Sequence, residues 1–325
     1  MDIYIDKANL VSLIKSRENA LYEDCLKLIK KQLNIFFNFS KDELRENEIL
    51  VAWITTLSQG VGENNTINFN SNFPIRPLKS NSTNTFSNEQ LSSVYLLEDE
   101  DILKLKGVGT VLIGSVGEEI DILEKLFFLQ KDYLFEKKWR INAPNFRAWN
   151  DLRPFSLPLT DIIIVDPFIL KNKDTDKDTL DSNLIEYLDV LGALTFTKVN
   201  VVVITNPNNM DYTYEQLKNK IVNKLNVCTG KNPFITLVRT SKEHDRTIFT
   251  NYKRVYSGDT FNFWNTLGRK ITNGREISYS SLAKSENHEI SREFLRDIQE
   301  TINFLKKSNP AYIEGDKKSN YLDFS

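Results

Sequence analysis

The sequence predicts an α/β protein with two domains. Residues 151–308 are expected to form a mostly parallel sheet flanked by helices, because apolar β-branched runs alternate with helical patterns there. Residues 1–150 show both patterns less regularly, so a mixed α/β domain is expected. A chain of 325 residues is long enough for two hydrophobic cores. Residues 309–325 are polar, and we expect them to form a flexible tail.

The composition excludes several classes of protein. A formal net charge of −2 means that nucleic-acid binding would need a local basic patch instead of a basic chain. Cys25 and Cys228 are the only cysteines, so neither a disulfide framework nor a cysteine metal site is expected. The chain begins without a basic, then apolar, leader, and no apolar run approaches the roughly 20 residues of a membrane helix. We therefore expect a cytoplasmic protein without a membrane partner.

The first half begins with a short strand, since Ile3 and Ile5 alternate with polar residues. Apolar residues at a spacing of three to four predict a helix over 25–37 and a second helix over 46–57. Residues 60–88 are rich in Asn, Ser and Thr, which indicates a long, partly disordered loop.

Order is expected to resume after residue 91. A buried strand is predicted over 109–115 and an amphipathic helix over 117–135, with acids in the first turn of the helix and lysines later. The glycines between 107 and 117 do not match G-x-G-x-x-G, and two of them precede the strand, so they are interpreted as turn residues. Residues 139–158 contain three prolines and are expected to be a surface connector at the domain boundary.

The second half alternates strand and helix regularly. A run of apolar residues at 161–170 predicts a strand that is covered on both faces. A charged loop is expected at 171–182, and a hairpin-like pair of strands between 246 and 261. The remaining elements are strands at 199–207 and 233–240 and helices at 183–194, 214–227 and 291–307.

Candidate chemistry centres on His244, one of only two histidines in the chain. If the segment around it is a strand, His244 and Arg246 share a face and Asp245 points the other way. An imidazole can attack phosphorus or donate a proton, and a guanidinium can hold two phosphate oxygens, so the pair is a candidate phosphate site. The alternative is a surface histidine in a network with neighbouring charges.

The segment 242–262 resembles the motif of the phospholipase D superfamily, H-x-K-x4-D-x6-G-S/T-x-N. His244 and Gly258 match the motif at the expected spacing, whereas Arg246 falls at the lysine position and Asn251 at the aspartate position. Asp259 stands at the Ser/Thr position, Thr260 follows it directly, and Asn262 lies one residue beyond the asparagine of the motif.

The predicted strand at 161–170 resembles the strand that opens many phospholipase-D-like domains, and it contains Asp166. An acid at the carboxyl end of a parallel strand lies where α/β sheets bind ligands. The alternative is that Asp166 forms a turn or a cap ahead of Pro167. The resemblance covers about a hundred residues and leaves the first half of the chain unexplained.

The resemblance implies a metal-independent reaction that needs two histidines, one forming a phosphohistidine and one protonating the leaving group. His288 lies outside any such motif, so activity would require a homodimer in which two His244 side chains meet. His244 would be the nucleophile and Arg246 the phosphate clamp, with Asp166 and Asn251 as orienting groups. No metal site and no cofactor are expected. Asp259 would repel a phosphate unless its carboxylate were turned away or bound to a metal.

Basic and aromatic residues alternate around the motif. Lys253 and Arg254, together with Gly258, Asp259 and Thr260, are the expected substrate-binding residues, since cations beside aromatic rings suit a single-stranded nucleic acid. The simpler interpretation is a pair of amphipathic strands with one buried and one solvated face.

Together these patterns predict a phosphodiester- or nucleic-acid-handling protein. It would be either a dimer-dependent nuclease or a degenerate phosphate-binding module, placed by analogy in bacterial antiviral defence. The alternative is a non-enzymatic scaffold whose first half, with its Asn-rich loop, recruits a protein partner.

Overall fold

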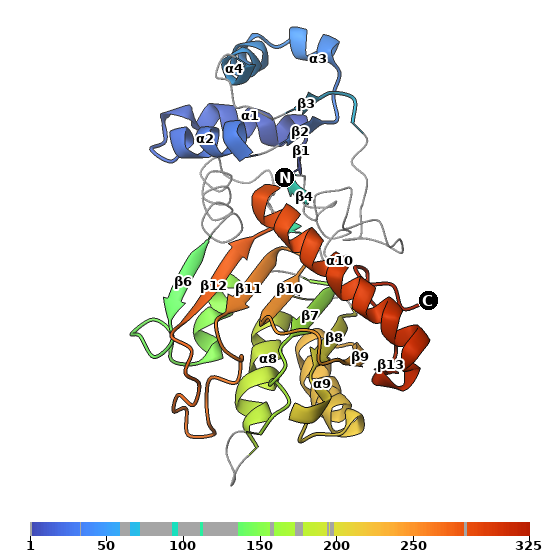
Figure 1. Ribbon diagram of the computed structural model, residues 1–325. Coiled ribbons are helices and arrows are strands. Elements are labelled where there is room, and N and C mark those ends of the chain that lie inside the picture. The colour runs from blue at the N-terminus through green and yellow to red at the C-terminus, as the bar shows by residue number, and fades with distance from the viewer. Residues whose placement is uncertain are drawn as a thin grey trace. The chain divides into compact units, whose positions relative to one another are not determined.

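The computed structural model describes residues 2–32, 34–58, 66–71, 93–96, 111–112, 136–156, 159–172, 178–193, 195, 198–282 and 285–325. The chain divides into two compact units (Figure 1). Unit 1 comprises Met1–Pro77 and Gln90–Leu134, and unit 2 comprises Phe135–Ser325 with Leu78–Glu89. The division near residue 135, instead of 150, follows from a strand at Lys137–Arg140 that pairs within the sheet of unit 2.

Unit 1 contains a parallel sheet with the strand order β3-β2-β1-β4-β5. The central strand β1 pairs with β2 on one side and with β4 on the other, both in parallel. The chain therefore builds one half of the sheet outward from β1 and then returns to build the other half. The strands are β1 Asp2–Ile5, β2 Asn34–Phe37, β3 Ile67–Asn68, β4 Ser93–Leu96 and β5 Val111–Leu112.

Four α-helices of unit 1 are described. They are α1 Lys7–Lys15, α2 Tyr22–Gln32, α3 Lys41–Arg45 and α4 Glu48–Ser58. The predicted strand at the start of the chain and the predicted helix at 46–57 are confirmed as β1 and α4.

The single helix predicted over 25–37 is wrong at its end. Helix α2 ends at Gln32, and Asn34–Phe37 form strand β2 beside β1. Ile35 and Phe37 are both buried, as expected in a strand where every second side chain faces the core. A short run of apolar residues such as 35–37 is compatible with a helix or a strand, so periodicity alone does not separate the two. Strand β3 lies within the predicted loop 60–88, and β5 lies within the predicted strand 109–115. The predicted helix 117–135 lies outside the described residues.

Unit 2 is built on a mixed sheet with the strand order β13-β9-β8-β7-β10-β11-β12-β6. Strands β7, β8 and β9 run parallel, and the other described neighbours pair antiparallel. The prediction of a mostly parallel sheet is therefore wrong, because short turns such as the one at 251–252 can join only antiparallel strands. The strands are β6 Lys137–Arg140, β7 Asp161–Val165, β8 Asn200–Thr205, β9 Phe234–Arg239, β10 Thr247–Thr250, β11 Lys253–Ser257, β12 Glu276–Ser281 and β13 Ile313–Gly315.

Helices cover both faces of this sheet. A π-helical turn at Asp181–Ile185 leads into α8 Glu186–Gly192, and α8 lies beside α9 Tyr214–Thr229 (Figure 1). Their apolar side chains share one core with alternate residues of β7 and β8. Helix α10 Ser285–Ser308 packs on the other face, where Phe294 lies 5.5 Å from the ring of Phe249. Burial on both faces explains the continuous apolar runs of the central strands.

Two segments of unit 2 differ from the prediction. The expected surface connector begins with the last two residues of β6 and contains the fully buried Trp149, whose ring stacks on Phe263 with centroids 4.9 Å apart. The expected flexible tail is wrong as well, because β13 pairs with β9 and Tyr321 and Leu322 are buried. In both segments a few large apolar side chains outweigh a polar composition. Among the described helices, none combines the length and the apolar character needed to cross a lipid bilayer.

Candidate functional site

Four polar residues form one row across the carboxyl edge of the parallel strands in unit 2. Arg239 at the end of β9 pairs with Thr205 at the end of β8. Asp166 follows β7, and its N–H bonds the carbonyl of Ile204. Arg246 directly precedes β10. Because Thr247 of β10 pairs with Val165, the last residue of β7, Arg246 lies opposite Asp166. Open α/β sheets bind ligands at this edge.

Asp166 is fully buried and holds the end of β7 against a later segment of the chain. Its Oδ1 accepts the N–H of Phe168 at 2.8 Å, which forms an Asx turn. Its Oδ2 accepts the hydroxyl of Thr260 and the N–H of Phe261, both at 2.7 Å. Burial raises the pKa of Asp166, while these hydrogen bonds and the charge of Arg246 oppose that rise. The carboxylate is thus an internal support, as the turn-forming alternative predicted.

Arg246 is half-buried beside this carboxylate. Its guanidinium carbon lies 5.8 Å from the centre of the Phe168 ring. Its Nε is buried and has no hydrogen-bond partner among the described residues. Both oxygens of Asp166 are already bonded to other groups. The geometry therefore leaves a cation with an unused donor at the carboxyl edge of the parallel strands.

His244 lies at the same edge but not on a strand. Residues 243–246 have no regular secondary structure. Strand β10 begins at Thr247, which pairs with Val165 of β7. The prediction that His244 and Arg246 share a strand face is therefore wrong. His244 is exposed, and Asp245 is exposed beside it. The histidine remains available to a ligand at Arg246, two residues away.

Asn251 lies at the opposite end of β10. Its Oδ1 accepts the N–H groups of Thr160 and Asp161 at 2.7 and 3.2 Å, and its Nδ2 donates to the hydroxyl of Tyr321 at 2.6 Å. The four residues of β10 separate this amide from His244 by roughly 13 Å. Asn251 therefore closes the start of β7, and its predicted catalytic grouping with His244 and Asp166 is wrong.

Thr260 and Phe261 bond Asp166, so the segment that follows Gly258 lies beside this carboxylate, but the side chains of Asp259 and Thr260 are engaged internally. Asp259 turns its Oδ2 to the N–H of Asn273 at 2.9 Å and to the N–H of Gly274 at 3.2 Å. The carboxylate of Asp259 is therefore turned toward the turn at 272–274. A Cβ on Gly258 would meet no atom within 4 Å, so sterics do not require glycine there.

Lys253 and Arg254 occupy opposite faces of β11. Lys253 is 3% exposed. Arg254 faces α10, with its guanidinium carbon 5.8 Å from the ring of Phe294, and burial lowers its pKa. These two residues therefore do not extend the Arg246 site into a basic track. The simpler interpretation, a strand pair with one solvated face, is wrong as well, because all four residues of β10 are buried and β11 exposes only Tyr256.

Two buried amides, Asn262 beside the last position of the motif and Asn183, complete the frame of this edge. Asn262 donates to the carbonyl of Phe168 at 2.7 Å and to that of Lys171 at 3.0 Å. Asn183, on the π-helical turn, accepts the N–H of Phe263 at 2.8 Å. Only the tertiary structure reveals that these side chains, with Asp166, fix the segment that follows Gly258.

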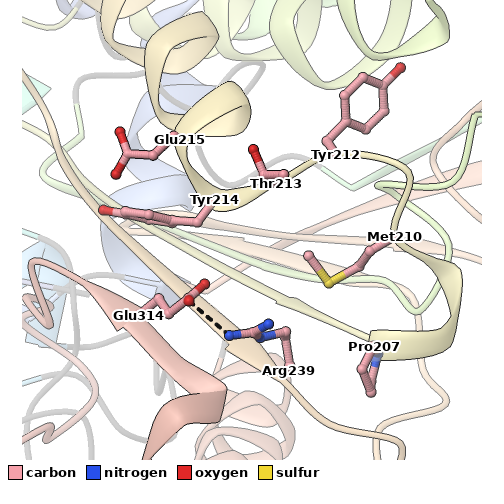
Figure 2. A pocket seen from close by; sticks show the side chains of 8 residues that line it. All are labelled: Pro207, Met210, Tyr212, Thr213, Tyr214, Glu215, Arg239 and Glu314. Atoms are coloured by element: carbon pink, nitrogen blue, oxygen red, sulfur yellow. Dashed lines mark ion pairs between the residues drawn. The ribbon is translucent and has the colours of Figure 1, made fainter.

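A pocket with a volume of about 530 Å³ opens at the other end of the row (Figure 2). Arg239 forms an ion pair with Glu314 at 2.9 Å and donates to the carbonyl of Ala311 at 2.8 Å. Tyr214 donates to the carbonyl of Ile235, and burial together with nearby carboxylates raises its pKa to about 12. The lining residues are Pro207, Met210, Tyr212, Thr213, Tyr214, Glu215, Arg239 and Glu314.

Unit 1 has a polar pair at the point where its strand order reverses. Asp6 follows β1 and caps α1, and its Oδ1 accepts the N–H of Asn9 at 2.7 Å. The amide nitrogen of Asn9 donates to both carboxylate oxygens at 3.0 Å. Asn9 is fully buried, and its Oδ1 has no hydrogen-bond partner among the described residues. An acid directly after a short strand and just before a helical pattern is the signal in the sequence that indicates this cap.

No protein-family model matches the chain, and no curated protein matches its sequence. Within the described part of the chain, no three His, Cys, Asp or Glu side chains are grouped as a metal site requires. The likeness to the phospholipase D superfamily thus remains a prediction from the motif.

Proposed function

We propose that unit 2 is a phospholipase-D-like module that binds the phosphodiester backbone of a single-stranded nucleic acid through Arg246, with His244 beside it. The observation that carries this proposal is the buried Nε of Arg246, which has no hydrogen-bond partner among the described residues. A buried donor without an acceptor costs about 1–3 kcal/mol. The side chain as a whole is only half-buried, and a guanidinium can hold two phosphate oxygens at once.

The structural roles of the other motif residues favour binding over catalytic turnover. A phosphohistidine reaction needs two histidines, and the second histidine of this chain, His288, is buried on α10. Asn251 supports the start of β7, and Asp259 supports the turn at 272–274. Hydrolysis would therefore require a homodimer that brings a second His244 to the phosphate. We propose that the single chain binds without cleaving, in the cytoplasm, in a role in bacterial genome defence.

The proposal is tested by fluorescence anisotropy with a labelled single-stranded oligonucleotide at several salt concentrations. Arg246→Ala should weaken binding about tenfold and reduce the salt dependence by about one counterion. The matched control is Arg140→Ala, because Arg140 is exposed on the edge strand β6, away from the row. Equal binding by wild type and Arg246→Ala would refute the phosphate site.

Turnover is tested separately with chelator present. We expect the monomer to release no cleaved product, and His244→Ala to leave that result unchanged. Cleavage by a dimer that is abolished by His244→Ala would instead establish the nuclease form of the proposal.

A second candidate is a non-enzymatic scaffold that recruits a protein partner through unit 1. The structural hydrogen bonds of Asn251 and Asp259 favour it, since a scaffold needs the fold of the motif but not its chemistry. If the wild-type chain binds no nucleic acid, the nucleic-acid-binding proposal is refuted and the scaffold function is favoured.

A further inference from the structure

The pocket and Arg246 lie at the two ends of the row that crosses the carboxyl edge of β9, β8, β7 and β10. Three strand spacings separate Arg239 from Arg246, which is about 14 Å. Thr205 lies between them and is 2% exposed. Among the described residues, the Nε of Arg239, the hydroxyl of Thr205 and the Nε of Arg246 all lack hydrogen-bond partners. Three of the four residues in the row therefore carry a buried polar atom without a hydrogen-bond partner among the described residues.

The pocket has the walls that a flat ring requires. Figure 2 shows the ring of Tyr214 on one side, the ion pair of Arg239 with Glu314 on another, and the thioether of Met210 across from the ring. The ring and the sulfur offer apolar, polarisable contacts. The ion pair offers donors and an acceptor along one wall. A volume of about 530 Å³ falls in the range of small-molecule sites.

The charges around the pocket disfavour a phosphate in it. Glu215 and Glu314 line the pocket, and Asp316 lies close enough to help raise the pKa of Tyr214. Arg239 is the only cation among the lining residues and already pairs with Glu314. An uncharged ring with donors and acceptors on its edge avoids this repulsion and can bond both members of the ion pair. A nucleobase has these properties.

We infer that the pocket lined by Tyr214, Met210, Arg239 and Glu314 is a base-binding subsite. It takes one unstacked nucleobase of a strand whose sugar-phosphate backbone is held at Arg246. This inference rests on the proposed function and deepens it, because it requires a single-stranded ligand longer than one nucleotide. A base inside a duplex could not enter the pocket without leaving its stack.

The test compares two labelled strands of equal length by fluorescence anisotropy. One is a single-stranded DNA, and the other is an abasic strand with the same sugar-phosphate backbone. The wild-type chain should bind the DNA about tenfold or more tightly than the abasic strand, because stacking on one aromatic side chain contributes that much. Tyr214→Leu should remove the difference by weakening only the DNA. Tyr256→Leu is the matched control, since Tyr256 is exposed on β11 outside the pocket.

The outcomes separate this inference from the proposed function. Binding of neither strand would overturn both. Equal binding of both strands by the wild type would overturn the base subsite and leave the phosphate site standing. A preference for DNA that survives in Tyr214→Leu would overturn the subsite as well. Met210→Glu is the second variant if Tyr214→Leu does not fold, because a carboxylate in the pocket should also abolish the preference.

Discussion

The buried carboxylate of Asp161 accepts the backbone N–H of Asn320 at 2.8 Å, and so joins the first residue of β7 to the end of the chain. The side chains of Ser319 and Asn320 donate to the same carboxylate at 3.0 and 2.6 Å. We expect Asp161→Ala to lower the free energy of unfolding by about 2–3 kcal/mol, because buried donors lose a charged acceptor. Urea unfolding measures this change. Asp297→Ala, at an exposed acid on α10, is the control. A loss below about 0.5 kcal/mol would mean that the C-terminal segment is not held by this residue.

Asp166 gives a prediction about pH. Burial raises its folded-state pKa above the ordinary value of 3.8. An acid with a raised folded pKa binds more protons when folded, so its contribution to stability is fully present below pH 3.8 and is lost as pH rises through the folded pKa. The stability of the wild type relative to Asp166→Asn should therefore fall as pH rises above about 4, as measured by urea unfolding at a series of pH values. A relative stability that rises over the same range would contradict this sign.

Trp149 tests the packing of the segment before β7. Its ring is fully buried and lies 4.2 Å, centroid to centroid, from that of Tyr187 on α8. Trp149→Ala should lower the free energy of unfolding by about 3–5 kcal/mol, since the cavity left by a buried tryptophan does not close. Chemical denaturation followed by circular dichroism measures the loss. A surface connector would instead give a change within about 0.5 kcal/mol.

Asp6 tests unit 1. Asp6→Ala removes the cap of α1 and leaves the buried amide nitrogen of Asn9 without its carboxylate acceptor. We expect a loss of about 1–2 kcal/mol, concentrated in unit 1. Hydrogen exchange of the α1 amides should accelerate, while amides of β7 and β8 in unit 2 should be unchanged. Asp24→Ala is the control, because Asp24 is an exposed acid on α2. Equal acceleration in both units would show that the effect is not a local loss of the cap.

Local patterns in the sequence determined much of unit 2. The β-branched run that ends before Asp166 predicted β7, and the strand-like patterns between 246 and 261 predicted the hairpin-like pair that β10 and β11 form. Each of these signals lies within a short stretch of the chain. Such local elements depend on side-chain periodicity and on turn residues, and both can be recognised from neighbouring residues alone. The sequence likewise singled out Arg246 as a candidate phosphate clamp, which stays a prediction, and the structure shows that its buried Nε has no hydrogen-bond partner among the described residues.

Only the tertiary structure decided which of these residues lie together. The length of β10 carries Asn251 to the far end of the sheet from His244, although the motif groups them. The pairing of β13 with β9 brings Glu314 to Arg239 and creates the pocket from a segment that its composition assigned to a flexible tail. Strand pairing joins residues that are far apart in the chain, and the burial of a few apolar side chains in the paired segments outweighs their polar composition. A local sequence pattern therefore could not reveal these long-range contacts.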